Sequence, residues 1–289
     1  MSGTVSVAHV ARWDGAAWGT VGAGVNGKVL ALLGFNDGSG ARLYAGGQFT
    51  GAGAVAATNI ASWNGSSWAA LAGGLGASAW EYVAALAAHN DGSGPALYAG
   101  GNFHSASTLV CNSIARWRGG AWSALGEGIQ QLVIISSSYY YTPGNVRSLV
   151  SFDDNGPGPR AAGLYAAGAF SLAGSAPVFC LARWDSGGWT HDLPFIAGGA
   201  ASAMALMDDD GPGPQAQAHA CHHRGGSHSA TLDIEFLDRN LRIRRREAVD
   251  DRDQVEGVDP ESNHVERRSC RRRSGRHAVM APAVMPRTM

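Results

Sequence analysis

Two short segments of this 289-residue chain carry the side chains best suited to contacting a ligand. They are Trp80, Glu81 and Tyr82, and Tyr139, Tyr140 and Tyr141, which directly follow three serines. Tyrosine and tryptophan offer flat apolar rings with one polar tip, which suits stacking against a sugar ring or a peptide. We therefore predict that these segments bind a carbohydrate or a protein. The alternative is that each segment packs against the edge of its own sheet.

Other clusters carry groups that can hold a metal ion. The segments 153–155 and 208–210 are rich in Asp and Asn oxygens, but they lack the alternating spacing and the distal glutamate of a calcium loop. Turn formation accounts for them, because Asp and Asn favour tight turns. The histidines near Cys221 have no zinc-finger spacing. We predict no metal site and no cofactor.

The sequence contains none of the common motifs of enzyme active sites. No nucleophile elbow, HExxH helix, phosphate-binding loop or dinucleotide-binding glycine motif occurs. Four histidines occupy unrelated positions in the repeats described next, so symmetry does not bring them together: His9, His89, His104 and His191. We predict no catalytic residues and a protein that is not an enzyme.

An internal repeat specifies the elements that must position these side chains. Four segments share two tryptophans five residues apart: ARWDGAAW (11–18), ASWNGSSW (61–68), ARWRGGAW (115–122) and ARWDSGGW (182–189). A second motif places a tyrosine 19 residues before the next first tryptophan: LYAGGQF (43–49), LYAGGNF (97–103) and LYAAGAF (164–170). A third motif is rich in Asp and Gly: 35–40, 89–94, 152–158 and 207–213.

Each repeat reads as short strands joined by tight turns. Asp14-Gly15 and Asn64-Gly65 predict type I′ hairpin turns, in which both central residues have positive φ. A two-residue loop pairs Trp13 with Ala16, whereas a four-residue loop pairs the two tryptophans directly. The Asp-Gly turn and the flanking apolar segments form a second hairpin. Four strands in about 50 residues match one blade of a β-propeller, so the repeated tryptophans are predicted to be buried in the blade core.

The repeats differ in length at one point. From Gly24, Gly74 and Gly128 to the valine of the next strand, the separation grows from 5 to 9 to 18 residues. Equivalent loops of successive blades emerge on one face, where insertions usually carry the binding function. The residues from Trp80 to Tyr82 and from Tyr139 to Tyr141 lie in these insertions.

The motifs L-Y-A-G-G-x-F and I-A-R-W-x-G-x-x-W resemble those of kelch-type propeller repeats. They are more similar still to the GGxFT…NIAxW…WxxLGxG repeats of bacterial secreted or surface proteins. The resemblance covers residues 8 to about 214. It implies a propeller used for display or binding, at the cell surface or outside the cell, and it transfers no catalytic residue. The N-terminus has no signal-peptide pattern.

Composition changes near residue 215. All nine Trp and all seven Tyr lie in the segment 1–214, which carries a net charge of −4, whereas the segment 215–289 carries +3. We therefore predict a repeat domain over 1–214 and a poorly ordered Arg- and His-rich tail over 215–289, with a hairpin across 238–240 as its one regular element. Its arginines are mixed with acids, so no nucleic-acid partner is expected. No apolar run is long enough to cross a membrane.

The sequence thus predicts an all-β propeller of about 3.5 four-stranded blades in an open ring. After 211–214 the expected fourth L-Y-A-G-G strand is missing, so sheet edges should remain bare. The predicted function is a non-enzymatic binding or structural module. The alternatives are a vestigial oxidase- or lyase-like propeller, and a truncated or frameshifted product without a function of its own.

Overall fold

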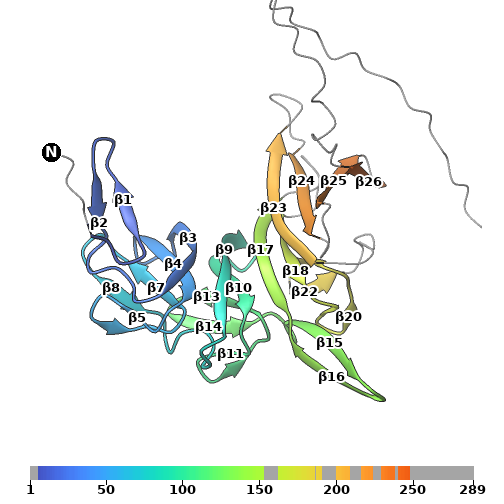
Figure 1. Cartoon of the computed structure of the whole chain (residues 1–289), viewed down its shortest axis with the longest axis horizontal. Coiled ribbons are helices and arrows are strands. Elements are labelled where there is room, and N and C mark those ends of the chain that lie inside the picture. The colour runs from blue at the N-terminus through green and yellow to red at the C-terminus, as the bar shows by residue number, and fades with distance from the viewer. Residues whose placement is uncertain are drawn as a thin grey trace, which may run out of the picture. The chain divides into compact units, whose positions relative to one another are not determined.

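A computed structural model describes residues 6–152, 162–185, 187–190, 200–208, 216–223, 229–237 and 240–247, with side chains up to Met204. All regular elements of these residues are β-strands, and the strand pairs are antiparallel. No helix long and apolar enough to cross a bilayer occurs among them. The predicted all-β class is therefore confirmed (Figure 1).

Four sheets follow one another along the chain, each with four strands in sequential order. The first sheet contains β3 (Lys28–Asn36), β4 (Ala41–Gln48), β7 (Ile60–Trp63) and β8 (Trp68–Ala70). The second contains β9 (Tyr82–Asn90), β10 (Pro95–Asn102), β13 (Ile114–Arg118) and β14 (Ala121–Ala124). The third contains β17 (Asn145–Phe152), β18 (Gly163–Ala169), β21 (Leu181–Asp185) and β22 (Gly188–Thr190). The fourth contains β23 (Ala200–Asp208), β24 (Ala216–His223), β25 (Ser229–Leu237) and β26 (Asn240–Glu247).

Shorter elements connect these sheets. β1 (Ala11–Trp13) and β2 (Trp18–Thr20) form a two-stranded sheet before the first sheet. Small hairpins lie within the repeats: β5 (Gly51–Ala52) with β6 (Val55–Ala56), and β11 (Ser105–Ala106) with β12 (Leu109–Val110). A further sheet contains β15 (Ile129–Ile135), β16 (Ser138–Pro143), β19 (Leu172–Ala173) and β20 (Ala176–Pro177). Each of these described sheets is open, with two free edges.

The tryptophan hairpins use the longer of the two predicted loops. Trp13 pairs directly with Trp18, and the same direct pairing recurs in the next three repeats. The predicted type I′ turns are wrong, because only the glycine of Asp14-Gly15 and of Asn64-Gly65 has positive φ. The Asp14 carboxylate instead accepts hydrogen bonds from the backbone N–H groups of Ala16 and Ala17, which closes the wider turn.

The Gly-Gly pair of the repeat fits two kinds of close approach. A Cβ on the second glycine, Gly47, would lie 1.9 Å from the Lys28 carbonyl oxygen, at a bulge that recurs in all four sheets. A Cβ on the first glycine, Gly46, would lie 2.6 Å from Val83 of the second sheet. The first glycine therefore lets the next sheet pack closely.

The core lies between successive sheets and is fixed by the second tryptophan of each repeat. Trp68 Nε1 donates to the Val21 carbonyl at 2.9 Å, and the next two repeats repeat this contact: Trp122 to Leu71 at 3.3 Å and Trp189 to Leu125 at 2.9 Å. Each acceptor lies three residues after the second tryptophan of the preceding repeat. Sheet packing and repeat length are thus coupled.

The prediction that all tryptophan pairs are buried is wrong for the first pair. Trp13 and Trp18 are 51% and 59% exposed, whereas Trp68, Trp117 and Trp184 are buried. The exposed pair belongs to the two-stranded sheet, against which no earlier sheet packs among the described residues.

The prediction that the strand after 211–214 is missing is also wrong. β24 lies there and pairs with β23 in the register of the earlier repeats, including the bulge. The predicted tail hairpin is confirmed as β25 and β26. The rest of the tail lies outside the described residues.

Candidate functional site

The three consecutive tyrosines lie on a projecting hairpin, here called the Tyr hairpin, formed by β15 and β16 (Figure 1). Its first residue, Ile129, pairs with Ala173 at the position where Val25 and Leu75 of the earlier repeats make single bridges to the small hairpins. The 14 residues inserted after it, 130–143, therefore extend an existing strand into a new hairpin. The insertion predicted as a loop is regular β-structure.

The tyrosines divide between the two faces of the Tyr hairpin. Tyr139 pairs with Ile134 and Tyr141 with Leu132, so these four side chains share one face. The two tyrosine rings meet edge to face with centroids 6.3 Å apart, and Tyr139 is 70% exposed. Tyr140 points to the opposite face.

The Tyr139–Tyr141 face is hollowed. A depression of about 380 Å³ is lined by both rings, by Leu132 and Ile134, and by the serines of the turn. No charged side chain occurs between Glu127 and Arg147. The surface therefore offers apolar faces and hydroxyl groups, and it suits an uncharged ligand.

The segment with Trp80, Glu81 and Tyr82 is arranged differently. The Glu81 carboxylate accepts three backbone hydrogen bonds, from Ala77, Ser78 and His104, each at 2.7 Å. Burial alone would raise the pKa of Glu81, but these hydrogen bonds outweigh burial and lower the pKa. Glu81 therefore holds its own loop in place, and its carboxylate is occupied.

Trp80 and Tyr82 flank this clamp. Trp80 is 74% exposed, whereas Tyr82 is half-buried and its hydroxyl accepts a hydrogen bond from Asn145 at 2.8 Å, just after the Tyr hairpin. No hydrogen bond or ring contact among the described residues joins Trp80 to the three tyrosines. Of the six predicted residues, Tyr139 and Tyr141 are the two in mutual contact.

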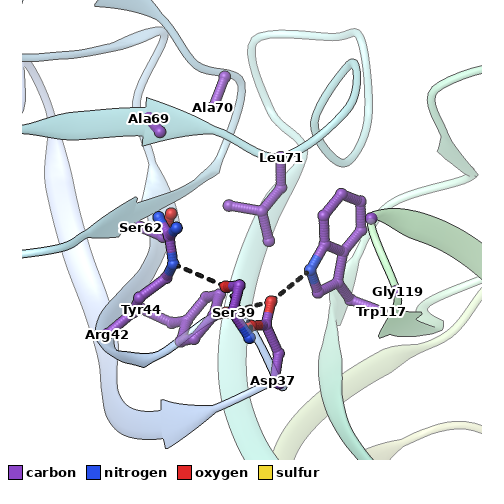
Figure 2. Close-up of a pocket in the computed structure, with 12 residues that line it drawn as sticks. Asp37, Ser39, Arg42, Tyr44, Ser62, Ala69, Ala70, Leu71, Trp117 and Gly119 are labelled. Atoms are coloured by element: carbon purple, nitrogen blue, oxygen red, sulfur yellow. Dashed lines mark hydrogen bonds between the residues drawn. The ribbon is translucent and has the colours of Figure 1, made fainter.

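The sequence did not predict a second hollow, which lies between the first and second sheets. It measures about 460 Å³ and is lined by Asp37, Arg42 and Ser62 of the first sheet and by Trp117 of the second. Figure 2 shows Arg42, Ser39, Asp37 and Trp117 joined in a row by hydrogen bonds. The other three repeats have arginine where Ser62 stands, and this difference was the available signal.

Asp37 is the charged centre of this hollow. Its carboxylate accepts hydrogen bonds from the Tyr44 hydroxyl at 2.8 Å and from Trp117 Nε1 at 3.3 Å. Burial alone would raise the pKa of Asp37, but the hydrogen bonds from Ser39 and Tyr44 outweigh burial and lower the pKa to about 2. Asp37 is therefore ionised at neutral pH, with its lone pairs largely used by the protein.

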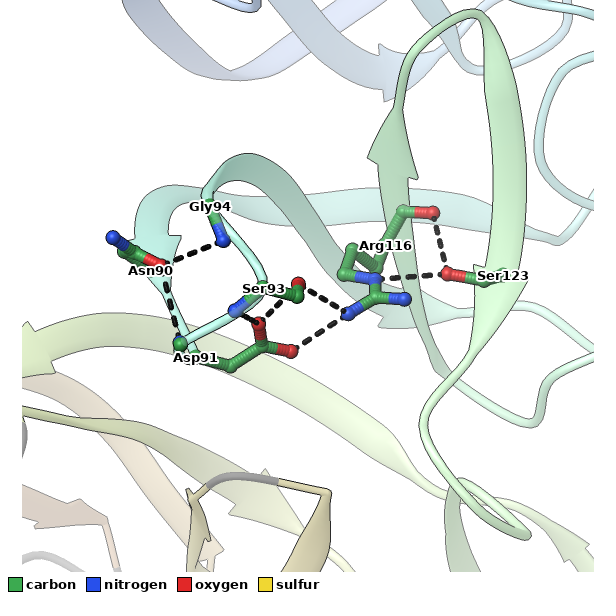
Figure 3. A network of polar contacts seen from close by, with 7 residues as sticks. Asn90, Asp91, Ser93, Gly94, Arg116 and Ser123 are labelled. Carbon is green, nitrogen blue, oxygen red and sulfur yellow. Dashed lines mark hydrogen bonds and ion pairs between the residues drawn. The ribbon is translucent and has the colours of Figure 1, made fainter.

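The equivalent place in the second sheet is filled by an arginine. Arg116 donates to Asp91 at 2.7 Å, to Ser93 at 3.2 Å and to Ser123 at 2.9 Å (Figure 3). Burial alone would raise the pKa of Asp91, but the hydrogen bonds from Ser93 outweigh burial, and the pKa falls to about 2. The turn aspartates of these two repeats thus join strands, as turn chemistry predicts.

Groups for metal or acid–base chemistry are dispersed. Within the described ranges, no three His, Cys, Asp or Glu side chains gather as metal ligands. His89 is buried, its Nδ1 lies 2.8 Å from Ser151 Oγ of the third sheet, and burial lowers its pKa. The acidic segment 153–155 and the histidines near Cys221 lie where side chains are not described.

Comparison of the chain with protein-family models, with curated proteins and with solved structures finds no match.

Proposed function

We propose that the chain is a non-enzymatic binding module built from kelch-like β-propeller repeats. Three features support this assignment. The sheets follow one another as four-stranded meanders, the same tryptophan contact links three successive pairs of repeats, and glycines of the first two sheets receive the valine of the next. Such stacking of repeated sheets is typical of propeller blades. The resemblance to bacterial surface repeats favours a secreted or surface location.

The ligand contacts the Tyr139–Tyr141 face of the Tyr hairpin. One observation carries this proposal: an exposed, hollowed and charge-free surface bears two tyrosine rings in contact. A neutral carbohydrate fits it best, because sugar rings stack on aromatic faces while their hydroxyl groups bond to Tyr and Ser hydroxyls. A protein strand paired with the free edge of β16 is the second candidate, since β16 ends its sheet.

A glycan array with matched variants tests this proposal. Tyr139→Ala and Tyr141→Ala should each weaken binding of a neutral glycan at least about tenfold, because each removes half of the stacking surface. Tyr140→Ala is the matched control, since it removes an exposed tyrosine from the opposite face. Equal losses in all three variants, or no glycan bound by the wild type, would overturn the proposal. Binding of an unstructured peptide that protects β16 amides from hydrogen exchange would favour the strand candidate.

A further inference from the structure

One face of the first sheet is covered only in part. Its outer strands are covered by the segment after β2, since Trp68 bonds to Val21 and a Cβ on Gly22 would lie 2.6 Å from the Trp63 ring. On the inner strand β3, Leu30 and Leu32 remain 49% and 51% exposed.

The other repeats show what covers this position. Leu86 of β9 and Leu149 of β17 occupy the register of Leu32, each opposite the alanine of the L-Y-A strand. Leu86 lies against Gly46 of the preceding sheet, and Leu149, which is buried, lies against Gly100. The covering element is thus the glycine-bearing second strand of a hairpin equivalent to β3–β4.

The same hairpin has a strand to pair with. In the three sheets that follow, the L-Y-A strand pairs with the A-x-W strand, placing Tyr44 opposite Ser62 and Tyr98 opposite Arg116. β1 is the A-x-W strand of the two-stranded sheet, and its second edge is free among the described residues. Because Asp14 N–H bonds across to β2, alternation points the N–H groups of Ala11 and Trp13 toward this free edge.

We propose that the free edge of β1 and the exposed Leu32 surface together form a docking site for a β-hairpin of the β3–β4 type, supplied by another polypeptide. Its L-Y-A strand pairs with β1, with its tyrosine opposite Arg12 and its leucine opposite Trp13. Its first glycine lies over Leu32, where a larger residue cannot fit. The site is separate from the Tyr hairpin, so the proposal is independent of the carbohydrate ligand.

A synthetic peptide with the sequence of residues 28–48 is the probe, added to the full chain. At about ten times its Kd, the peptide should slow hydrogen exchange at the Ala11 and Trp13 amides about tenfold. A peptide carrying Gly46→Val should give no protection, because a Cβ at this position meets the facing valine and leucine in the equivalent packing.

Two variants of the chain complete the test. Leu32→Lys should abolish protection by placing a charge under the docked hairpin, and it should leave the fold intact because Leu32 is half-exposed. Leu109→Lys is the control, since Leu109 is 38% exposed on a small hairpin of the next repeat. The proposal is overturned if the peptide leaves both amides unchanged, if Leu32→Lys binds like the wild type, or if both amides are already protected without peptide.

Discussion

Asp37 and Asp91 show how one turn residue takes different partners in neighbouring sheets. Asp91 pairs with Arg116 of its own sheet, whereas Asp37 faces Ser62 in the equivalent register and receives Trp117 from the next sheet. An arginine-to-serine difference of one residue therefore replaces an ion pair by a hollow of about 460 Å³.

The Asp91 pair predicts a dependence of stability on pH. The Asp91 pKa of about 2 in the folded chain lies below its ordinary 3.8, so the unfolded chain binds this proton more readily. The resulting stabilisation, about 2 kcal/mol, is complete at neutral pH and is lost as pH falls from about 4 through 2. Urea unfolding across this range should show a smaller acid-induced loss in Asp91→Asn than in the wild type. Parallel stability curves would contradict this expectation.

At the scale of the elements, the tryptophan hairpin has two parts with separate tasks. Ring contact within the pair, at 5.0 to 5.5 Å between centroids, belongs to one sheet. The Nε1 hydrogen bond of the second tryptophan joins that sheet to the preceding repeat. The same residue type therefore stabilises both the hairpin and its packing.

A pair of substitutions separates these tasks. Trp68→Ala removes a buried ring and leaves the Val21 carbonyl without its donor, so it should lower the free energy of unfolding by about 3 to 5 kcal/mol. Trp18→Ala removes only an exposed ring and should cost about 1 kcal/mol or less. Thermal or urea unfolding of both variants measures the difference. Similar losses in the two variants would show that packing against the preceding repeat contributes little.

The molecule as a whole combines near-neighbour packing with one projecting, uncharged hairpin. The Tyr hairpin exposes Ile134, Ile135 and three tyrosines beside a free β16 edge. Apolar, charge-free edge strands are prone to pair with copies of themselves. Self-association should therefore begin at this hairpin.

Ile135→Lys tests this expectation without touching the proposed ligand face. Ile135 pairs with Ser138 on the face opposite Tyr139 and Tyr141, so the lysine adds a charge there. Light scattering during incubation should show slower aggregation than in the wild type, with glycan binding retained. Leu109→Lys adds a charge elsewhere and serves as the control. Equal slowing by both variants would point to net charge as the cause.

The repeat made much of the fold predictable, because the constant 19- and 5-residue spacings are strand registers. Leu43 to Trp63 and Trp63 to Trp68 are paired residues in the structure. What the sequence left undetermined depends on neighbours in space. The exposure of Trp13 follows from what packs beside its sheet, and the occupied Glu81 carboxylate from the backbone of His104, 23 residues away.

Candidate site residues were harder to assign for the same reason. Consecutive tyrosines in the sequence give no sign of their faces until strand pairing is known, and pairing puts Tyr140 on the opposite side from Tyr139 and Tyr141. The hollow at Asp37 needs two sheets, and only the serine at position 62 marks it in the sequence.

The tryptophan hydrogen bonds between repeats all point backwards along the chain. Trp68, Trp122 and Trp189 donate to carbonyls 47, 51 and 64 residues earlier. During synthesis, each acceptor therefore leaves the ribosome before its donor is made. At about 5 to 20 residues per second, every new repeat reaches its predecessor several seconds after that predecessor has emerged. The nascent chain can thus assemble in order, each repeat closing onto one already present.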